Sequence, residues 1–309
     1  MLRKKSAKPV RISLMSPKVL EVKSLSKIFD GGFSLKKMKR NEPTVAVDKI
    51  SFNIRKGEIV GLLGPNGAGK TTTIQMLLGT TSKTSGRIKY FGKDFDRHHS
   101  ESLQRVNYAS AYTRLPWRMT VRENLMVYAK MYQVAKPKER IETVLELFRM
   151  SKYIDKSFGM LSSGQITRVM LAKAMINFPA LLLLDEPTAS LDPEIATKVR
   201  QFLLKQREKY NVSMLFTSHN MSEVTELCDR VVFLRSGRIV AEDTPRGLAK
   251  RIQICTVRYV VDGKETAVKV KEKEIAAFLN KLSQEKIKYS EISIDKPTLE
   301  DFFLSNSYE

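Results

Sequence analysis

Short apolar runs, bounded by glycine and polar residues, recur along most of the chain. Residues 59–63 read Ile-Val-Gly-Leu-Leu, and residues 181–184 are four leucines followed by two acids. A third, mostly apolar run covers residues 212–216 and leads into Thr-Ser-His. Runs of this kind are typical of parallel strands that are buried on both faces. Residues 72–78 and 166–177 carry apolar positions at helical spacing, so the pattern predicts an α/β domain.

The pattern changes after about residue 250. Residues 254–261 and 264–270 read as two strands, and Asp262-Gly263 between them is a two-residue hairpin signal. Residues 274–282 then place apolar side chains on one helical face. An imperfect strand and a closing helix follow, so residues 251–309 are predicted to form a small α+β domain.

The segment between the first buried strand and its following helix carries a phosphate-binding pattern. The pattern Gly-x-x-x-x-Gly-Lys-Thr in this position lets backbone N–H groups surround phosphate oxygens. The N-terminus of the following helix adds a positive end. We expect Lys70 to reach the β- and γ-phosphates and the Thr71 hydroxyl to hold Mg²⁺. The nucleotide-binding segment is Gly64, Pro65, Asn66, Gly67, Ala68, Gly69, Lys70, Thr71 and Thr72.

Two acids end the leucine strand. Asp185 and Glu186 stand at its carboxyl end, where ligands sit in open α/β sheets. Asp185 is predicted to hold Mg²⁺ through its water shell. Glu186 is predicted to polarise the attacking water, a role that contributes about 10²–10⁴ in rate. The plainer alternative is a pair of solvated carboxylates at a strand end.

Two further segments suggest contacts with phosphate. Leu161-Ser162-Ser163-Gly164-Gln165 precedes a predicted helix, whose N-terminus is a second anion-binding end. His219 follows the strand at residues 212–216. A lone histidine is more often structural or solvated. At the end of a buried strand, in a chain with a phosphate loop, it is a candidate for contact with a γ-phosphate.

The order of these motifs resembles the nucleotide-binding subunit of ATP-binding-cassette (ABC) transporters, over roughly residues 20–250. The resemblance implies a P-loop NTPase cassette, with a mixed sheet core, an antiparallel edge sheet and a helical subdomain at about residues 100–160. It makes Asp185 the Walker B aspartate, Glu186 the catalytic glutamate and His219 the switch histidine. The other nucleotide contacts that it implies are Phe29, stacking on adenine, then Ser162, Ser163, Gly164 and Gln165 of the signature, and Asp192 of the D-loop.

The resemblance also implies a mechanism and partners. In this family the signature of one cassette completes the nucleotide site of another, so that two ATP molecules are sandwiched between two cassettes. The expected partners are integral-membrane permease subunits and a second copy of this chain or a paralogous cassette. The tail resembles the accessory domain of exporter-type cassettes, whose closing helix often reads S/T-L-E-D-x-F. These features imply an ATP-hydrolysing subunit of an exporter at the cytoplasmic face of the membrane, with ATP and Mg²⁺ as cofactors. They leave the transported substrate open.

The chain departs from the family pattern at two positions. Ser163 stands where the family signature usually has glycine, and its small side chain is expected to do little damage. Tyr108 upstream and residues 120–125 downstream fix a register that puts Ala111 at the family's conserved glutamine. Alanine neither touches Mg²⁺ nor senses a membrane partner. Either Tyr112 or Thr113 substitutes, or water fills the site, or hydrolysis is slower.

The region expected to be helical offers two local signals. Thr120-x-x-Glu123 is a capping-box pattern, which predicts a helix from there to about Tyr132. In the resembling family, this region meets the permease. Trp117, the single tryptophan, lies on the loop before the helix. We expect it in the core rather than at a docking surface.

Composition narrows the class of protein and its partners. The 309 residues carry a net charge of +21, and basic residues cluster in a tail at 1–19 and an insertion at 31–43. Such clusters suit anionic lipid headgroups of the inner leaflet or nucleic acid, and as often they are simply solvated. No apolar run approaches the ~20 residues of a membrane helix. Cys228 and Cys255 show neither metal-ligand spacing nor a disulfide framework, which suggests a reducing cytosol.

Two other functions remain possible from the sequence. A soluble ABC ATPase that acts on ribosomes or nucleic acid suits the positive charge. Such proteins usually carry two cassettes or a long coiled coil, which this chain lacks, so we do not expect nucleic acid as a partner. A regulatory nucleotide-binding module with little hydrolysis is the other alternative. The presence of Glu186 and His219 argues against it.

Overall fold

The computed structural model describes residues 16–31, 33–34, 39–40, 42–110, 114–189, 191–261, 263–285 and 287–307. The chain divides into two compact units, with the division after residue 242. The sequence pattern placed this division near residue 250. In the structure α8 (Pro245–Lys250) packs against α10 (Leu299–Ser307), so both helices belong to the second unit.

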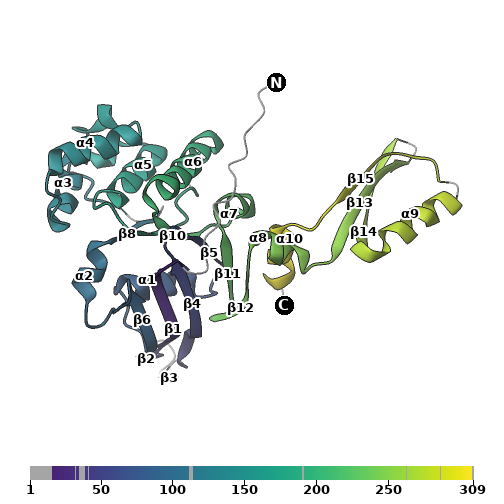
Figure 1. The fold of residues 1–309 in the computed structure, drawn as a ribbon, viewed down its shortest axis with the longest axis horizontal. Coiled ribbons are helices and arrows are strands. Elements are labelled where there is room, and N and C mark those ends of the chain that lie inside the picture. The colour runs from purple at the N-terminus through teal and green to yellow at the C-terminus, as the bar shows by residue number, and fades with distance from the viewer. Residues whose placement is uncertain are drawn as a thin grey trace. The chain divides into compact units, whose positions relative to one another are not determined.

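Two sheets form the frame of the first unit (Figure 1). The six-stranded sheet has the order β12-β11-β5-β10-β9-β8, and its pairs from β11 to β8 are parallel. Its strands are β5 (Ile59–Leu63), β8 (Val106–Ser110), β9 (Leu181–Asp185), β10 (Ser213–Thr217), β11 (Arg230–Arg235) and β12 (Arg238–Asp243). The four-stranded antiparallel sheet has the order β4-β1-β6-β7, from β1 (Lys18–Phe29), β4 (Thr44–Arg55), β6 (Ser85–Tyr90) and β7 (Lys93–Asp94).

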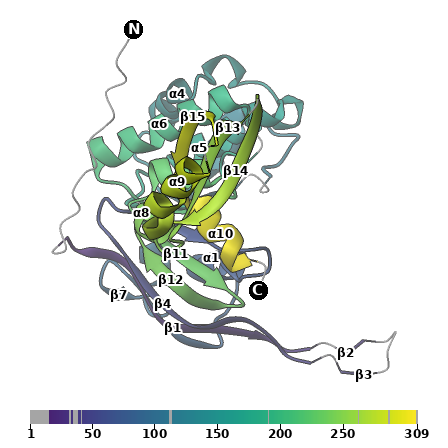
Figure 2. The same cartoon turned by 90° about the vertical axis from the view of Figure 1, so that its right-hand side faces the viewer.

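The long strands β1 and β4 run side by side as an antiparallel ribbon (Figure 2). Strand β1 already begins at Lys18, inside the predicted basic tail, whose first fifteen residues lie outside the described part of the chain. Two short paired strands, β2 (Phe33–Ser34) and β3 (Lys39–Arg40), lie within the predicted 31–43 insertion.

The main hydrophobic core lies between the two sheets and includes α1 (Lys70–Leu78). Ile74 and Leu77 of this helix pack in one cluster with Leu20 of the antiparallel sheet and with Leu62 and Leu183 of the parallel strands. All five residues of β5, of β9 and of β10 are buried. The prediction of three strands covered on both faces is therefore confirmed.

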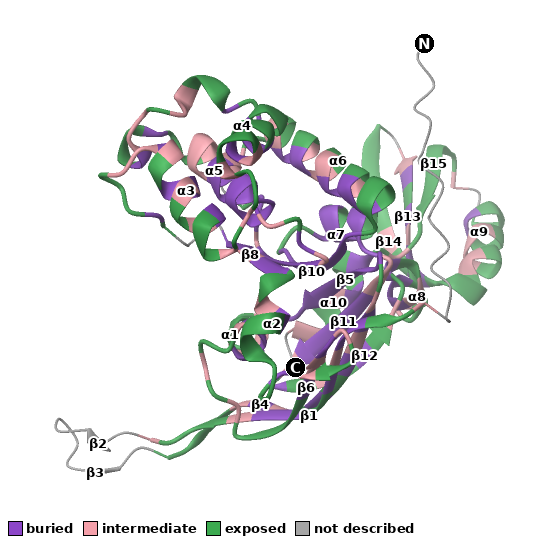
Figure 3. Ribbon diagram, turned by 60° about the vertical axis from the view of Figure 1, so that its left-hand side comes forward, coloured by how far each residue is buried: buried purple, intermediate pink, exposed green. Residues whose placement is uncertain are grey.

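Helices cover the other face of the six-stranded sheet, and their buried stripes face inward (Figure 3). The predicted helix after Thr120 is confirmed, because Thr120 and Glu123 form a complete capping box. The predicted helical region also contains β8, an edge strand of the six-stranded sheet. The helices of this unit besides α1 are α2 (His99–Gln104), α3 (Val121–Met131), α4 (Pro137–Leu147), α5 (Ser163–Ala174), α6 (Pro193–Tyr210) and α7 (Met221–Leu227), with short 3-10 turns at Ser151–Tyr153 and Phe158–Met160.

The second unit contains a three-stranded antiparallel sheet with the order β14-β13-β15. Val261 pairs with Lys264, which confirms the hairpin, although Asp262 lies outside the described residues. The apolar face of α9 packs with Val257, Tyr259 and Val270 of the sheet. The bounds are β13 (Ile254–Val261), β14 (Lys264–Lys271), a 3-10 turn at Glu272–Glu274, α9 (Ile275–Gln284) and β15 (Tyr289–Asp295).

Across the described ranges, the structure has no helix that is both long and apolar enough to traverse a bilayer.

Candidate nucleotide site

The phosphate loop has the tight backbone that its glycines predict. Gly64 and Gly69 adopt φ values of +146° and +99°. A Cβ at Gly64 would lie 2.1 Å from the carbonyl oxygen of Leu234, and one at Gly69 would lie 2.4 Å from that of Ala46. Helix α1 begins immediately after Gly69, so its free N–H groups face the loop. The loop therefore fits an anion and excludes side chains at these two positions.

The side chain of Lys70 is held by backbone carbonyl groups of the phosphate loop. The Nζ of Lys70 donates to the carbonyl oxygens of Gly64, at 2.6 Å, and of Pro65, at 3.0 Å. Burial lowers the pKa of Lys70, and the carboxylates of Glu186 and Asp185 act in the opposite direction. The two acids of β9 thus lie within electrostatic reach of the lysine, as expected when strands end at one edge of a sheet.

A threonine holds the two acids in place. Thr217 Oγ1 donates to Asp185 Oδ1 at 2.7 Å and accepts from the backbone N–H of Glu186 at 3.0 Å. Thr217 is fully buried and pairs directly with Asp185 in the parallel register of β10 and β9. No motif in the sequence assigned a role to Thr217. Its position just before Ser218 and His219, at the end of the neighbouring strand, is the signal that would have found it.

Glu186 has an unusual backbone and a close partner. Its φ is +50°, in the left-handed region that residues other than glycine seldom adopt and that is frequent at functional sites. His219 Nε2 lies 2.6 Å from Glu186 Oε1. The turn after β9 and the end of β10 therefore bring the two predicted catalytic side chains into contact.

The signature segment begins α5. Ser162 is the N-cap and forms a capping box with Gln165, whose amide oxygen accepts from the Ser162 N–H at 3.1 Å. The predicted helix start is confirmed, and its capping box was not predicted. Ser163 is the first helical residue and is exposed, without a positive φ. A side chain is therefore tolerated there, and glycine is not required. A Cβ on Gly164 would lie 3.8 Å from Leu191, an ordinary contact distance.

The signature is separate from the phosphate loop of the same chain. Helix α1 lies against the face of the six-stranded sheet that points to the antiparallel sheet, whereas α5 lies on the opposite face (Figures 1 and 3). Among the described residues, no hydrogen bond or ion pair connects 162–165 to 64–72. One chain thus presents two anion-binding ends that do not meet.

The remaining predicted contacts lie at exposed positions or outside the description. Phe29 is exposed at the end of β1, with Lys27 Nζ 4.9 Å from its ring centroid. Asp192 is the exposed N-cap residue of α6 and accepts from the Ala196 N–H. Ala111 lies outside the described residues together with Tyr112 and Thr113, so its predicted effect remains a prediction.

A buried glutamate next to these residues was not recognised in the sequence. Glu223 is only 3% exposed. Its Oε2 accepts from Thr188 Oγ1 at 2.6 Å and from Ser218 Oγ at 3.1 Å. Its Oε1 forms an ion pair with Arg200 Nη1 at 2.9 Å. Glu223 therefore ties the segment after Glu186 to the residue before His219 and to α6.

The donor set fits nucleotide-bound Mg²⁺. No cluster of three or more His, Cys, Asp or Glu side chains suited to a metal occurs in the described part of the chain. A hydroxyl from Thr71 and a buried carboxylate from Asp185 fit this ion, because Mg²⁺ in phosphoryl-transfer sites takes most of its ligands from phosphate and water.

The chain has many relatives among known proteins. A family model described as ABC transporter matches residues 47–189. The chain is 37% identical over 206 residues to the bacitracin transport ATP-binding protein BcrA of Bacillus licheniformis, a match that covers 67% of each protein. It is 36% identical over 225 residues to the Nod factor export ATP-binding protein I of Burkholderia thailandensis, covering 71% of this chain and 72% of that protein.

The chain belongs to the ABC transporter family.

Solved structures agree with this assignment. An ATP-binding subunit of an ABC transporter superposes with a TM-score of 0.65 at 26% identity, over 76% of this chain and 93% of that one. A dimeric ATP-binding cassette bound to ADP and Pi superposes with a TM-score of 0.64 over 73% of this chain and 98% of that one. At 22% identity this second match shows the fold alone. The chain is thus the ATP-binding subunit of an ABC transporter, an ATPase with the P-loop cassette fold and with ATP and Mg²⁺ as cofactors.

Proposed function

We propose that this ABC subunit hydrolyses ATP as a head-to-tail dimer of cassettes and powers a separate membrane permease of an exporter. The main observation that supports this proposal is that the signature at the start of α5 and the phosphate loop lie on opposite faces of one sheet. A second cassette supplies what each site lacks. Ser162 and Gly164 of one chain then face the γ-phosphate held by Lys70 of the other.

Each residue of the site has a role in this proposal. Lys70 neutralises the β- and γ-phosphates, and Thr71 and Asp185 hold Mg²⁺, which neutralises charge on the phosphates. Glu186 orients the attacking water, and His219 holds Glu186 in place across their 2.6 Å contact. Phosphoryl transfer depends on such positioning and charge neutralisation. The outlying contacts are Phe29, which stacks on adenine, and Asp192, Ser163 and Gln165, which line the closed dimer.

Exposed apolar residues support a permease partner. Trp117 is 72% exposed, which contradicts its expected place in the core, and Met160 beside it is 69% exposed. The Gly159 N–H donates to the Trp117 carbonyl at 2.9 Å, so the two loops that carry these exposed residues lie side by side. A solvent-exposed tryptophan next to a methionine suits a cytoplasmic segment of a permease. The site of action would be the cytoplasmic face of the membrane, where the basic tail can meet anionic lipids.

The direction of transport rests on the relatives. BcrA is named for bacitracin transport and the Burkholderia protein for Nod factor export. The second unit, with its Thr298-Leu299-Glu300-Asp301 helix start, resembles the accessory domain of many exporter-type cassettes, which supports this direction. Export is therefore the proposed direction, and no substrate is assigned.

Complementation tests the dimer. Lys70→Met disables the phosphate loop, and Gly164→Asp places a negative charge at the signature segment. In a mixed dimer, one of the two composite sites keeps both Lys70 and Gly164. We expect each variant alone to be nearly inactive and their mixture to recover a substantial part of the wild-type ATPase rate. A mixture as inactive as its components would contradict the composite site.

A second experiment tests the permease surface. Trp117→Ser should reduce co-purification of the chain with its membrane fraction, while ATPase activity of the purified subunit stays unchanged. Phe178→Ser is the matched control, because Phe178 is also exposed, at 68%. Equal membrane association of both variants and the wild type would exclude this docking surface.

A further inference from the structure

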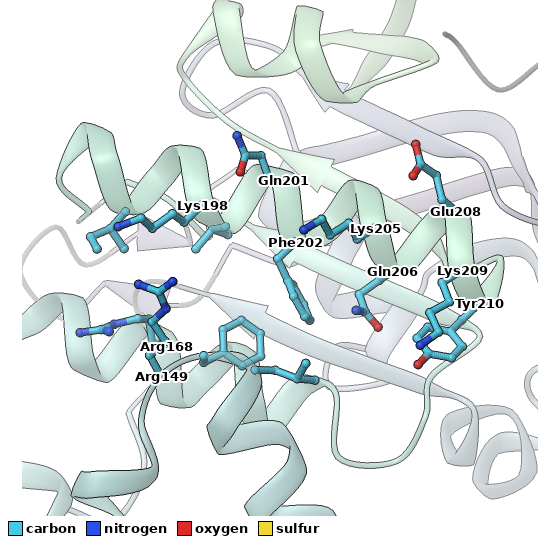
Figure 4. Close-up of a pocket in the computed structure, with 14 residues that line it drawn as sticks. Arg149, Arg168, Lys198, Gln201, Phe202, Lys205, Gln206, Glu208, Lys209 and Tyr210 are labelled. Atoms are coloured by element: carbon cyan, nitrogen blue, oxygen red, sulfur yellow. The ribbon is translucent and has the colours of Figure 1, made fainter. Parts of the chain in front are cut away.

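A cavity of about 750 Å³ opens between the end of α4, the side of α5 and most of α6 (Figure 4). This volume lies within the range of roughly 300–1,000 Å³ that small-molecule sites occupy. No residue of the phosphate loop lines it, and neither do Asp185, Glu186 and His219. The cavity is therefore a feature distinct from the nucleotide site.

The middle of the cavity is apolar. Phe148 at the end of α4 and Phe202 of α6 lie with ring centroids 4.5 Å apart. Val199, one helical turn before Phe202, is buried next to them on the same side of α6. An aromatic and aliphatic wall of this kind favours the apolar body of a ligand.

The rim is strongly basic. Arg149, Arg168 and Lys198 gather at one end of the cavity in Figure 4, and Lys205 and Lys209 follow along α6. Glu208 is the single acid among the lining residues. Glu194, outside the lining, forms an ion pair with Lys198, so the excess of positive charge persists. Cations around an apolar wall complement a negatively charged group.

A mostly buried glutamine presents its amide to this space. Gln206 is 7% exposed and lines the cavity, with its amide directed toward the cavity in Figure 4. Its side chain makes no hydrogen bond with any residue that the structure describes. The amide atoms are not sealed off from the cavity, because the buried side-chain atoms without a partner in the described residues belong to Asn53 and Arg207. A ligand in the cavity can therefore take the place of water on this amide. The amide offers both a donor and an acceptor.

We propose that this cavity binds a small anionic amphiphile. Its carboxylate or phosphate contacts Arg149, Arg168 and Lys198, and its apolar body packs on the two phenylalanines. A hydroxyl or amide at its far end bonds to Gln206. Lys198 and Gln206 are eight positions apart in α6, about 12 Å along a helix that rises 1.5 Å per residue. The ligand is therefore elongated, with polar groups at both ends.

The experiment uses three probes of similar length and different ends. 10-Hydroxydecanoate has an acid and a hydroxyl, decanoate has the acid alone, and decanol has neither charge nor a second polar end. Binding to the purified full chain is measured by calorimetry with saturating MgADP, which keeps the acids out of the nucleotide site. We expect 1:1 binding of 10-hydroxydecanoate, about fivefold tighter than decanoate because of one added hydrogen bond. Decanol should bind more weakly than both acids.

Two variants and a control locate the site. Arg149→Asn removes a charge, and asparagine tolerates the positive φ of 54° there. It should weaken both acids about fivefold. Gln206→Leu keeps the buried volume, so it should remove the preference for the hydroxylated acid and leave decanoate binding intact. Lys138→Gln, in the first turn of α4 and away from the cavity, should change neither. Arg168 is left unchanged because its Nε also donates to the Gly164 carbonyl.

Several results would overturn the proposal. They are no binding of 10-hydroxydecanoate by the wild type, equal affinity for decanol and decanoate, or equal affinities in the two cavity variants and the control. ATPase activity of every variant, measured alongside, shows that each chain is folded.

Discussion

The Nε2 atom of His219 lies 2.6 Å from Oε1 of Glu186, although 33 positions separate the two residues in the sequence. The contact forms because β9 and β10 are neighbours in parallel register and end at the same edge. Thr217 stabilises this contact through its hydrogen bonds to Asp185 and to the Glu186 backbone. The carboxylate that we assign to water activation therefore has a defined orientation before any nucleotide is added.

Replacing the charge of Glu186 tests that assignment. Glu186→Gln keeps the side-chain size and a hydrogen-bonding group toward His219 but removes the base. We expect nucleotide affinity within about twofold of the wild type and an ATPase rate lowered by a factor of about 10² or more. Binding of a fluorescent ATP analogue and steady-state phosphate release measure the two quantities. Turnover close to that of the wild type would disprove the role of Glu186.

Glu223 offers a test of how the site is held together. Glu223→Gln removes the buried charge beside Arg200 and weakens the tie to Thr188 and Ser218. Arg200 keeps its ion pair with Glu226 in this variant. We therefore expect a loss of stability of about 2 kcal/mol, from weakened hydrogen bonds to a buried charged acceptor, and a fall in kcat larger than the change in KM. Urea unfolding and steady-state kinetics measure both.

The chain contains a matched control for that variant. Glu226 pairs with the same Arg200, through Nε at 2.7 Å, but its own side chain is largely solvent-accessible. Glu226→Gln should cost no more than about 1 kcal/mol and leave kcat unchanged. Equal effects of the two substitutions would mean that burial of Glu223 has no special role.

Ser163 should be replaceable by the residue common in the family signature. Because Ser163 is an exposed first residue of α5, without a positive φ, glycine relieves nothing there. Ser163→Gly is expected to change the ATPase rate less than twofold and to lower stability by at most about 1 kcal/mol. Phosphate release and thermal unfolding measure these effects. A tenfold increase in rate would show instead that the serine limits this cassette.

Lys173 should make the free energy of unfolding depend on pH in the alkaline range. Its Nζ donates to the Tyr108 carbonyl at 2.7 Å, and burial lowers the pKa of Lys173 to about 8 from the usual 10.5. Between these pH values the unfolded chain holds the proton that the folded chain has lost, so stability from this group rises with pH. At about 1.4 kcal/mol per pH unit, the rise is on the order of 3 kcal/mol.

The comparison with Lys173→Met isolates that contribution. Denaturant unfolding of both proteins, at pH values from about 7 to 10, should show the wild type gaining on the variant as pH increases. A constant difference across this range would show that the Lys173 proton is not lost on folding.

Features that depend on residues close together in the chain could be predicted from the sequence alone. The glycines and Lys70 of the phosphate loop, the acids at the end of β9 and the start of α3 each follow from local backbone geometry and hydrogen bonding. The motif order resembled one family, and the relatives show that family. The alternation of buried strands and helices likewise follows from the spacing of apolar side chains, which can be read from any short run of residues.

Features that depend on residues far apart in the chain could not be predicted in this way. Strand register placed Thr217 beside Asp185, and helix packing brought Glu223 to Thr188 and Arg200. The same packing left Trp117 at the surface and opened the cavity over Gln206, both of which depend on which neighbours cover a side chain. Burial and long-range contacts are properties of the assembled layers, because hydrophobic free energy depends on the area removed from water rather than on the local sequence.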